Sequence, residues 1–166
     1  MRFRCSGPDD THAAARALAD CVSEEGLVLA LVGPLGAGKT AFVKGLAEGL
    51  GLDPAQVSSP TFVIANQFAT PDGRALAHVD LYRLETESDL DGIGFADMLE
   101  PGAVVAVEWA DRLPGALPPD VLTVRIERDP EDQESRSFAV HATGKGSQAV
   151  LEAWKSRLER APVEMP

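Results

Sequence analysis

The chain has 166 residues, of which 45% are hydrophobic and 25% are charged, and its formal net charge is −11 at pH 7. This length suffices for one domain with a sizeable core, and no apolar run is long enough to cross a bilayer, so we expect no membrane association. The negative charge repels nucleic-acid backbones, which predicts that any nucleic acid involved in the function is held by a partner protein.

The N-terminus and the cysteines indicate a cytoplasmic location. Residues 1–4 do not open a signal peptide. Cys5 and Cys21 lack the close paired spacing of a metal or redox motif, which suits a reduced compartment.

The first predicted elements are a strand, a helix and a second strand. Residues 2–6 are predicted to form a short strand. Asp9, Asp10 and Thr11 then offer an N-cap for a helix with one apolar face. Leu27–Val32 is continuously apolar, which is typical of a parallel strand buried on both faces.

Residues 33–40, Gly-Pro-Leu-Gly-Ala-Gly-Lys-Thr, fit the pattern G-x-x-x-x-G-K-[ST] of a phosphate-binding loop. We expect an amphipathic helix after this phosphate loop, ending at Gly51, so that a helix N-terminus favours an anion at the loop. A glycine-rich turn without a ligand is the alternative, but the strand–loop–helix context favours a nucleoside triphosphate bound with Mg²⁺. The loop residues predicted to contact the nucleotide are Gly33, Gly36, Ala37, Gly38, Lys39 and Thr40.

The rest of the chain predicts an α/β fold. The patterns indicate strands at residues 62–68, 75–81 and 103–107, a broken helical segment at 87–99, a hairpin of 122–127 with 136–142, and a final helix around 150–158. We therefore expect a single P-loop NTPase-like domain over residues 1–166, with a mixed, mostly parallel sheet flanked by helices, a C-terminal antiparallel hairpin and a flexible tail at 161–166.

Two carboxylates close predicted parallel strands, where ligands bind in open α/β sheets. Asp80 ends the run Ala-Leu-Ala-His-Val-Asp, and Glu108 ends Ala-Val-Val-Ala-Val-Glu. Phosphate-loop enzymes need one acidic residue for Mg²⁺ and a group that orients the attacking water. Both residues are candidates for these two tasks, and their spacing does not decide which does which. The alternative for each is a carboxylate that only caps the next turn.

Four other side chains are weaker candidates. Thr61 lies in a connector and could reach the γ-phosphate or Mg²⁺, or could be an ordinary turn residue. Thr11 is best explained as a helix cap, and His78 as a structural histidine on the same strand face as Asp80. Trp109, next to Glu108, belongs either to the core or to a shield over the site.

Four motifs occur in order and with compatible gaps: Gly33-Pro-Leu-Gly-Ala-Gly-Lys-Thr40, Ser59-Pro-Thr-Phe62, His78-Val-Asp-Leu-Tyr-Arg-Leu84 and Val107-Glu-Trp109. This combination resembles the TsaE (YjeE) family, the bacterial ATPases of tRNA threonylcarbamoyladenosine biosynthesis. The similarity runs from about residue 9 to residue 136. The phosphate loop alone is unspecific, whereas the four motifs together are highly specific.

The resemblance implies a small P-loop fold and an Mg²⁺-dependent ATPase that acts on two partner proteins, TsaD and TsaB. In that family the partners attach the threonylcarbamoyl group to the adenosine beside the anticodon of tRNAs that read codons beginning with A. Hydrolysis of ATP is thought to reset the complex between turnovers. The chain is thus expected to meet tRNA only indirectly, through the complex.

The resemblance also assigns roles to residues. It implies that Lys39 binds phosphates, that Thr40 and Glu108 are Mg²⁺ ligands, and that Asp80 is an essential strand-end acid. The remaining matches place Thr61 in a nucleotide-sensing switch, Trp109 beside the γ-phosphate, Thr11 near the adenine and Arg136 facing the nucleotide.

Two departures from the family pattern lie in the loop. Pro34 replaces a common Asp and removes one backbone donor, and Ala41 replaces a common Thr after the Mg²⁺ ligand. Because Lys39 and Thr40 are retained, binding is expected to persist. The alternatives to an ATPase are a nucleotide-gated binding module with incidental hydrolysis and a small-molecule kinase. The kinase ranks last, because no arginine-dense lid is visible.

Overall fold

A computed structural model describes residues 1–60 and 64–160 of the chain. The strands are β1 (Arg2–Cys5), β2 (Leu27–Val32), β3 (Ala65–Ala69), β4 (Ala75–Asp80), β5 (Val104–Glu108), β6 (Leu122–Arg128) and β7 (Arg136–Ala142). The α-helices are α1 (Pro8–Ala19), α2 (Lys39–Gly49), α3 (Ser88–Asp91), α4 (Phe95–Met98) and α5 (Lys145–Leu158). Short 3₁₀ turns lie at Pro54–Gln56, Ala110–Arg112 and Pro114–Ala116.

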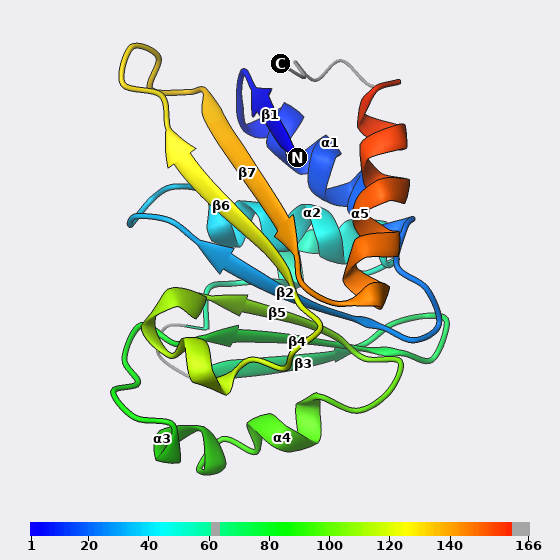
Figure 1. Cartoon of the computed structure of the whole chain (residues 1–166), viewed down its shortest axis with the longest axis vertical. Helices are drawn as coiled ribbons and strands as arrows, with labels where there is room; N and C mark the ends of the chain where they lie inside the picture. The colour runs from blue at the N-terminus through cyan, green and yellow to red at the C-terminus, as the bar shows by residue number, and fades with distance from the viewer. Residues whose placement is uncertain (61–63, 161–166) are drawn as a thin grey trace.

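The seven strands form one sheet in the order β1-β7-β6-β2-β5-β4-β3 (Figure 1). The four central strands, β6, β2, β5 and β4, run parallel. β3 pairs antiparallel with β4, and at the other edge β7 pairs antiparallel with both β6 and β1. The predicted α/β fold, with a mixed sheet that is parallel at its centre and a C-terminal hairpin, is confirmed.

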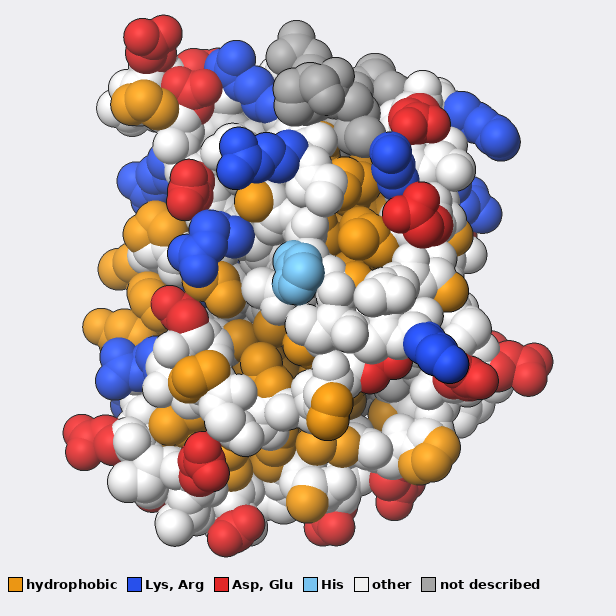
Figure 2. Space-filling view, viewed as in Figure 1, with side chains coloured by type: hydrophobic (Ala, Val, Ile, Leu, Met, Phe, Trp, Pro, Cys, Tyr) orange, Lys and Arg blue, Asp and Glu red, His pale blue; other side chains and the backbone are white. Residues whose placement is uncertain are grey.

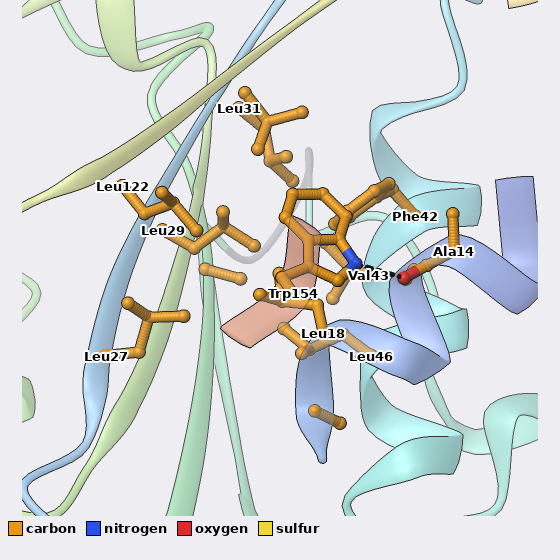
Figure 3. Packing of buried hydrophobic residues seen from close by; sticks show 14 of the residues in the cluster. Ala14, Leu18, Leu27, Leu29, Leu31, Phe42, Val43, Leu46, Leu122 and Trp154 are labelled. Carbon is orange, nitrogen blue, oxygen red and sulfur yellow. Dashed lines mark hydrogen bonds between the residues drawn. The ribbon is translucent and has the colours of Figure 1, made fainter. Parts of the chain in front are cut away.

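Helices cover both faces of the sheet (Figure 1). α1, α2 and α5 enclose the larger core, which is centred on the fully buried Trp154. Its indole N–H donates to the Ala14 carbonyl at 2.9 Å (Figure 3). Its ring lies edge-on to Phe3 and Phe42. α3 and α4 cover the second core on the other face. The two cores hold β2, β4 and β5 so that their carboxyl ends meet at one edge of the sheet.

Several element boundaries differ from the predictions; the final helix, for example, begins at Lys145 and not near residue 150. α1 begins at Pro8 with Gly7 as its N-cap, so the predicted cap at residues 9–11 was wrong. Proline is favoured at the first helical position because its missing N–H would have no helical partner there. Of the strand predicted at 62–68, residues 62 and 63 lie outside the described residues; β3 is Ala65–Ala69, and Ile64 before it has a φ of 73°, which is not extended. The predicted tail at 161–166 lies outside the described residues.

The predicted end of α2 at Gly51 is confirmed. Gly51 has a φ of 83°, its N–H donates to the Glu48 carbonyl, and the next N–H, of Leu52, donates to the Ala47 carbonyl. This pair of bonds is the Schellman arrangement that ends helices at a left-handed glycine.

α1 and α2 approach each other through two glycines on α2. A Cβ placed on Gly45 would lie 2.6 Å from the His12 carbonyl oxygen and 2.9 Å from the Ala15 Cβ. A Cβ on Gly49 would lie 2.7 Å from the Arg16 carbonyl oxygen. This contact matters for function because α2 carries the phosphate loop at its N-terminus.

The close approach predicts that Gly45→Ala destabilises the fold. Alanine is the better helix former by about 1 kcal/mol, but the clash with α1 backbone should cost about 1–3 kcal/mol and outweigh that gain. Urea unfolding measures the difference. Ala153→Gly on the exposed face of α5 is the control, and it should lose only the propensity term of about 1 kcal/mol. A stabilised Gly45→Ala protein would contradict the packing.

Acidic and basic side chains are interspersed on the face drawn in Figure 2, and the coloured residues there form no continuous basic patch. This pattern agrees with the net charge of −11. Among the described residues, no helix is long and apolar enough to span a membrane.

Candidate nucleotide-binding site

The phosphate loop connects the carboxyl end of β2 to the N-terminus of α2. Its conformation requires glycine, because Gly36 and Gly38 have φ values of 71° and 108°, which side chains disfavour. A Cβ on Gly38 would meet open space, so the loop backbone there is accessible to a ligand. The loop therefore presents a helix N-terminus to an open cradle, as phosphate binding needs.

The two predicted carboxylates lie side by side at this edge. Asp80 and Glu108 are register partners at the ends of the adjacent parallel strands β4 and β5, and both are 3% exposed. β2 pairs with the other side of β5, with Leu31 opposite Glu108. The structure thus brings both acids to the strand end from which the phosphate loop departs.

Glu108 is bonded directly to the loop. The Thr40 hydroxyl donates to Glu108 Oε1 at 2.7 Å, and His78 Nε2 lies 2.8 Å from the same oxygen. Asp80 is held differently, because its Oδ1 accepts from the Tyr82 N–H at 2.8 Å. The carboxylate next to the predicted Mg²⁺-binding hydroxyl is therefore that of Glu108.

Lys39 lies folded against its own loop. Its Nζ donates to the carbonyls of Gly33 at 2.7 Å and Pro34 at 3.0 Å, and it lies 3.8 Å from the centre of the Trp109 ring. Burial lowers the pKa of Lys39, while the Glu108 and Asp80 carboxylates act in the opposite direction. The ammonium is thus close to the cradle, in contacts that compete with an incoming phosphate.

Trp109 lies where β5 turns away from the sheet. It adopts a left-handed backbone conformation, with a φ of 57°, directly after Glu108. Its ring packs against Tyr82 at 4.8 Å between centroids as well as under Lys39. Trp109 therefore both packs against the second core and forms a wall of the site.

Two arginines of the β6–β7 hairpin hold the outer side of the loop. Arg128 donates to the carbonyls of Leu35 at 3.1 Å and Gly36 at 3.2 Å, and Arg136 donates to the Ala37 carbonyl at 2.9 Å. With the Lys39 bonds, every carbonyl from residue 33 to residue 37 accepts from a cationic side chain. Arg136 thus contacts the loop backbone. Arg128 was missed by sequence reasoning, because no motif marks it.

We predict that Arg128→Ala weakens ATP binding by about 10-fold, because two charge-assisted hydrogen bonds that fix the loop are lost from an exposed position. Arg128→Lys should be only partly effective, since an ammonium does not match the two-carbonyl geometry of a guanidinium. Calorimetric titration with Mg-ATP measures the effect. Arg125→Ala, at an exposed position three residues earlier on the same strand β6, is the matched control and should bind like the wild type.

A small cavity of about 210 Å³ lies between the loop and the strand ends. The lining residues are Leu35, Gly36, Gly38, Lys39, Thr40, Ala41, Ser59, Asp80, Glu108 and Trp109. Most of the predicted site residues are therefore together. Gly33 and Ala37 belong to the phosphate loop but do not line the cavity.

Three other predicted residues lie elsewhere or outside the described chain. Thr11 is in the first turn of α1, buried, and its hydroxyl donates to the Gly7 carbonyl, so it neither caps the helix nor lines the cavity. Arg136 contacts the loop from behind the cavity lining. Thr61 lies outside the described residues.

The donors at the loop fit Mg²⁺. Among residues 1–60 and 64–160, no group of three or more His, Cys, Asp or Glu side chains could hold a metal by itself. Mg²⁺ does not need such a cage, because it takes oxygen donors and is usually held by one or two protein groups together with phosphates and water. Thr40 and Glu108 provide that minimal oxygen set.

The comparison with known proteins decides the family. Residues 5–138 match the family described as "Threonylcarbamoyl adenosine biosynthesis protein TsaE". The chain belongs to the TsaE family. It is 39% identical to the TsaE protein of Bacillus subtilis over 83% of this chain and 84% of that one. It is 41% identical to the TsaE protein of Streptomyces coelicolor over 79% and 88%.

A solved structure agrees with this membership. The crystal structure of Bacillus subtilis YdiB superposes with a TM-score of 0.72 at 32% sequence identity, covering 95% of each chain. Both relatives named above are called tRNA threonylcarbamoyladenosine biosynthesis proteins. The resemblance found in the sequence motifs is confirmed, and it extends over nearly the whole fold.

Proposed function

We propose that this chain is an Mg²⁺-dependent ATPase of tRNA threonylcarbamoyladenosine formation. The observation that carries the proposal is the hydrogen bond from Thr40, the last residue of the phosphate loop, to the strand-end carboxylate of Glu108. This pair lies in a cavity that also contains Lys39 and Asp80. Phosphate-loop hydrolases need these four functions: a phosphate cation, a hydroxyl for Mg²⁺, an acid beside it and an acid for water.

The geometry supports a division of labour between the acids. Glu108 accepts the hydrogen bond of the Thr40 hydroxyl, which leaves the lone pairs of that oxygen for a cation, so we assign Glu108 to the Mg²⁺ side. Asp80 is the register neighbour of Glu108 on β4, and its Oδ1 accepts from the Tyr82 N–H, so we assign this second acid to the attacking water. Bound Mg²⁺ would neutralise charge on the phosphates. Lys39 would bind the same phosphates after leaving its carbonyl partners.

The proposal includes the partners TsaD and TsaB, with tRNA reached through their complex. The names of the relatives support the pathway. The charge of −11 and the mixed surface in Figure 2 support indirect contact with tRNA. Release of phosphate from ATP, measured for the chain alone and then with TsaB, TsaD and tRNA, tests the proposal. Absence of Mg²⁺-dependent phosphate release in both samples would overturn it.

One observation favours a second candidate, a nucleotide-gated binding module. Lys39 is bonded to two loop carbonyls and stacked on Trp109, so nucleotide binding must rearrange the loop wall. Asp80→Asn separates the two functions, because it should stop hydrolysis while ATP still binds. tRNA modification that survives in this variant would favour gating, and loss of modification would favour the ATPase.

A further inference from the structure

His78 contacts the candidate Mg²⁺ site from inside the sheet, and the proposed function leaves it without a role. It lies on β4, its side chain is fully buried, and its Nε2 is 2.8 Å from Glu108 Oε1. The same oxygen accepts from the Thr40 hydroxyl at 2.7 Å. Three side chains from β4, β5 and the phosphate loop thus form one hydrogen-bonded row that ends at the cavity.

The chemistry of the row fixes its direction. A carboxylate only accepts hydrogen bonds, so both His78 Nε2 and the Thr40 hydroxyl donate to Glu108. Because the only O–H of Thr40 donates to Glu108, the lone pairs of the Thr40 oxygen face away from the carboxylate. An oxygen with its lone pairs directed at the cavity is the donor that Mg²⁺ takes.

The other ring nitrogen indicates that structure alone does not account for this histidine. Nδ1 is buried and has no hydrogen-bond partner among the described residues. An unsatisfied buried polar atom destabilises the fold, and an apolar side chain at this strand position would avoid that cost. The compensating contact of His78 is the bond to Glu108, whose Oε1 also accepts from the Thr40 hydroxyl.

We propose that His78 is a positioning residue for Mg²⁺. Its Nε2–H holds Glu108 in the orientation that accepts the hydrogen bond from the Thr40 hydroxyl. The lone pairs of the Thr40 oxygen are thereby directed toward the cation. This inference rests on the proposed function, since it presumes that the loop binds Mg-ATP. It assigns His78 no contact with the nucleotide and no part in proton transfer.

Three substitutions of different reach test the row. In His78→Gln the amide nitrogen can occupy the position of Nε2, whereas in His78→Asn it reaches only the position of Nδ1, and His78→Leu has no donor. The His78→Leu and His78→Asn variants should need about 10- to 100-fold more Mg²⁺ for half-maximal nucleotide binding, the range expected when a hydrogen-bond partner of a metal ligand is lost. Gln should recover most of the loss. His141→Leu, at an exposed position of β7, is the control.

The readout separates positioning from damage to the fold. Calorimetry with ATP in EDTA measures the phosphate cradle without the cation, and this affinity should stay close to the wild-type value in all three variants. Equal Mg²⁺ dependence in wild type and His78→Leu, or equal effects of Asn and Gln, would overturn the inference while the proposed function stands. A wild-type chain that binds no Mg-ATP would overturn both.

Discussion

Glu108→Gln should lower the rate of ATP hydrolysis by on the order of 100-fold or more, the range expected when a group that orders a reacting centre is lost. The glutamine keeps the size of the side chain but removes its negative charge and supplies an N–H₂ donor. The amide oxygen is a weaker, uncharged acceptor for the Thr40 hydroxyl, which donates to the carboxylate at 2.7 Å in the wild type, and the negative charge beside the cation is lost. Phosphate release at saturating Mg-ATP measures the loss.

Nucleotide binding separates this effect from misfolding. ATP affinity in EDTA should be retained or increased, because a carboxylate beside the phosphates repels them in the absence of a cation. Glu152→Gln on the exposed face of α5 makes the same chemical change away from the site, and it should hydrolyse ATP like the wild type. Wild-type turnover in Glu108→Gln would remove Glu108 from the Mg²⁺ side of the site.

The sequence predicted those parts of the site that depend on local pattern. The run Leu27–Val32 and the loop motif predicted the strand–loop–helix unit, because burial and glycine spacing are visible in a few adjacent residues. Asp80 and Glu108 were placed together because parallel strands end at one edge. Both predictions required the direction of the strands but no side-chain conformations.

The remaining parts of the site depend on contacts that only the folded chain creates. Arg128 and the Gly36 carbonyl that it binds are 92 residues apart, and the charge pattern of β6 does not distinguish this arginine from an ordinary exposed one. His78 was interpreted as a structural histidine on the Asp80 face of its strand, and its contact with Glu108 could not be predicted because Glu108 lies on another strand. The folded position of Lys39 follows from side-chain geometry around Trp109, which periodicity does not encode.

The start of α1 shows a different kind of error. The residues at 9–11 are good caps in isolation, and the prediction gave them more weight than the Gly-Pro pair before them. Proline is favoured at the first helical position, and the helix therefore begins at Pro8, before the predicted cap. The acids then lie in the first turn, where the Asp10 carboxylate accepts from the Ser6 N–H.

Lys39→Ala should weaken Mg-ATP binding by about 100-fold or more, since each hydrogen bond from the ammonium to a phosphate oxygen contributes about 1.5–3 kcal/mol. The loss is a difference between two sets of contacts, because the ammonium must first leave the Gly33 and Pro34 carbonyls and the Trp109 ring. In the variant the Gly33 and Pro34 carbonyls stay in the loop, and as hydrogen-bond acceptors they cannot replace the ammonium as a ligand of the phosphates. Calorimetric titration measures the affinity, and Lys44→Ala on the same helix controls for net charge. Unchanged or tighter binding in Lys39→Ala would mean that Lys39 only competes with the nucleotide through its contacts with the loop and is not a phosphate ligand.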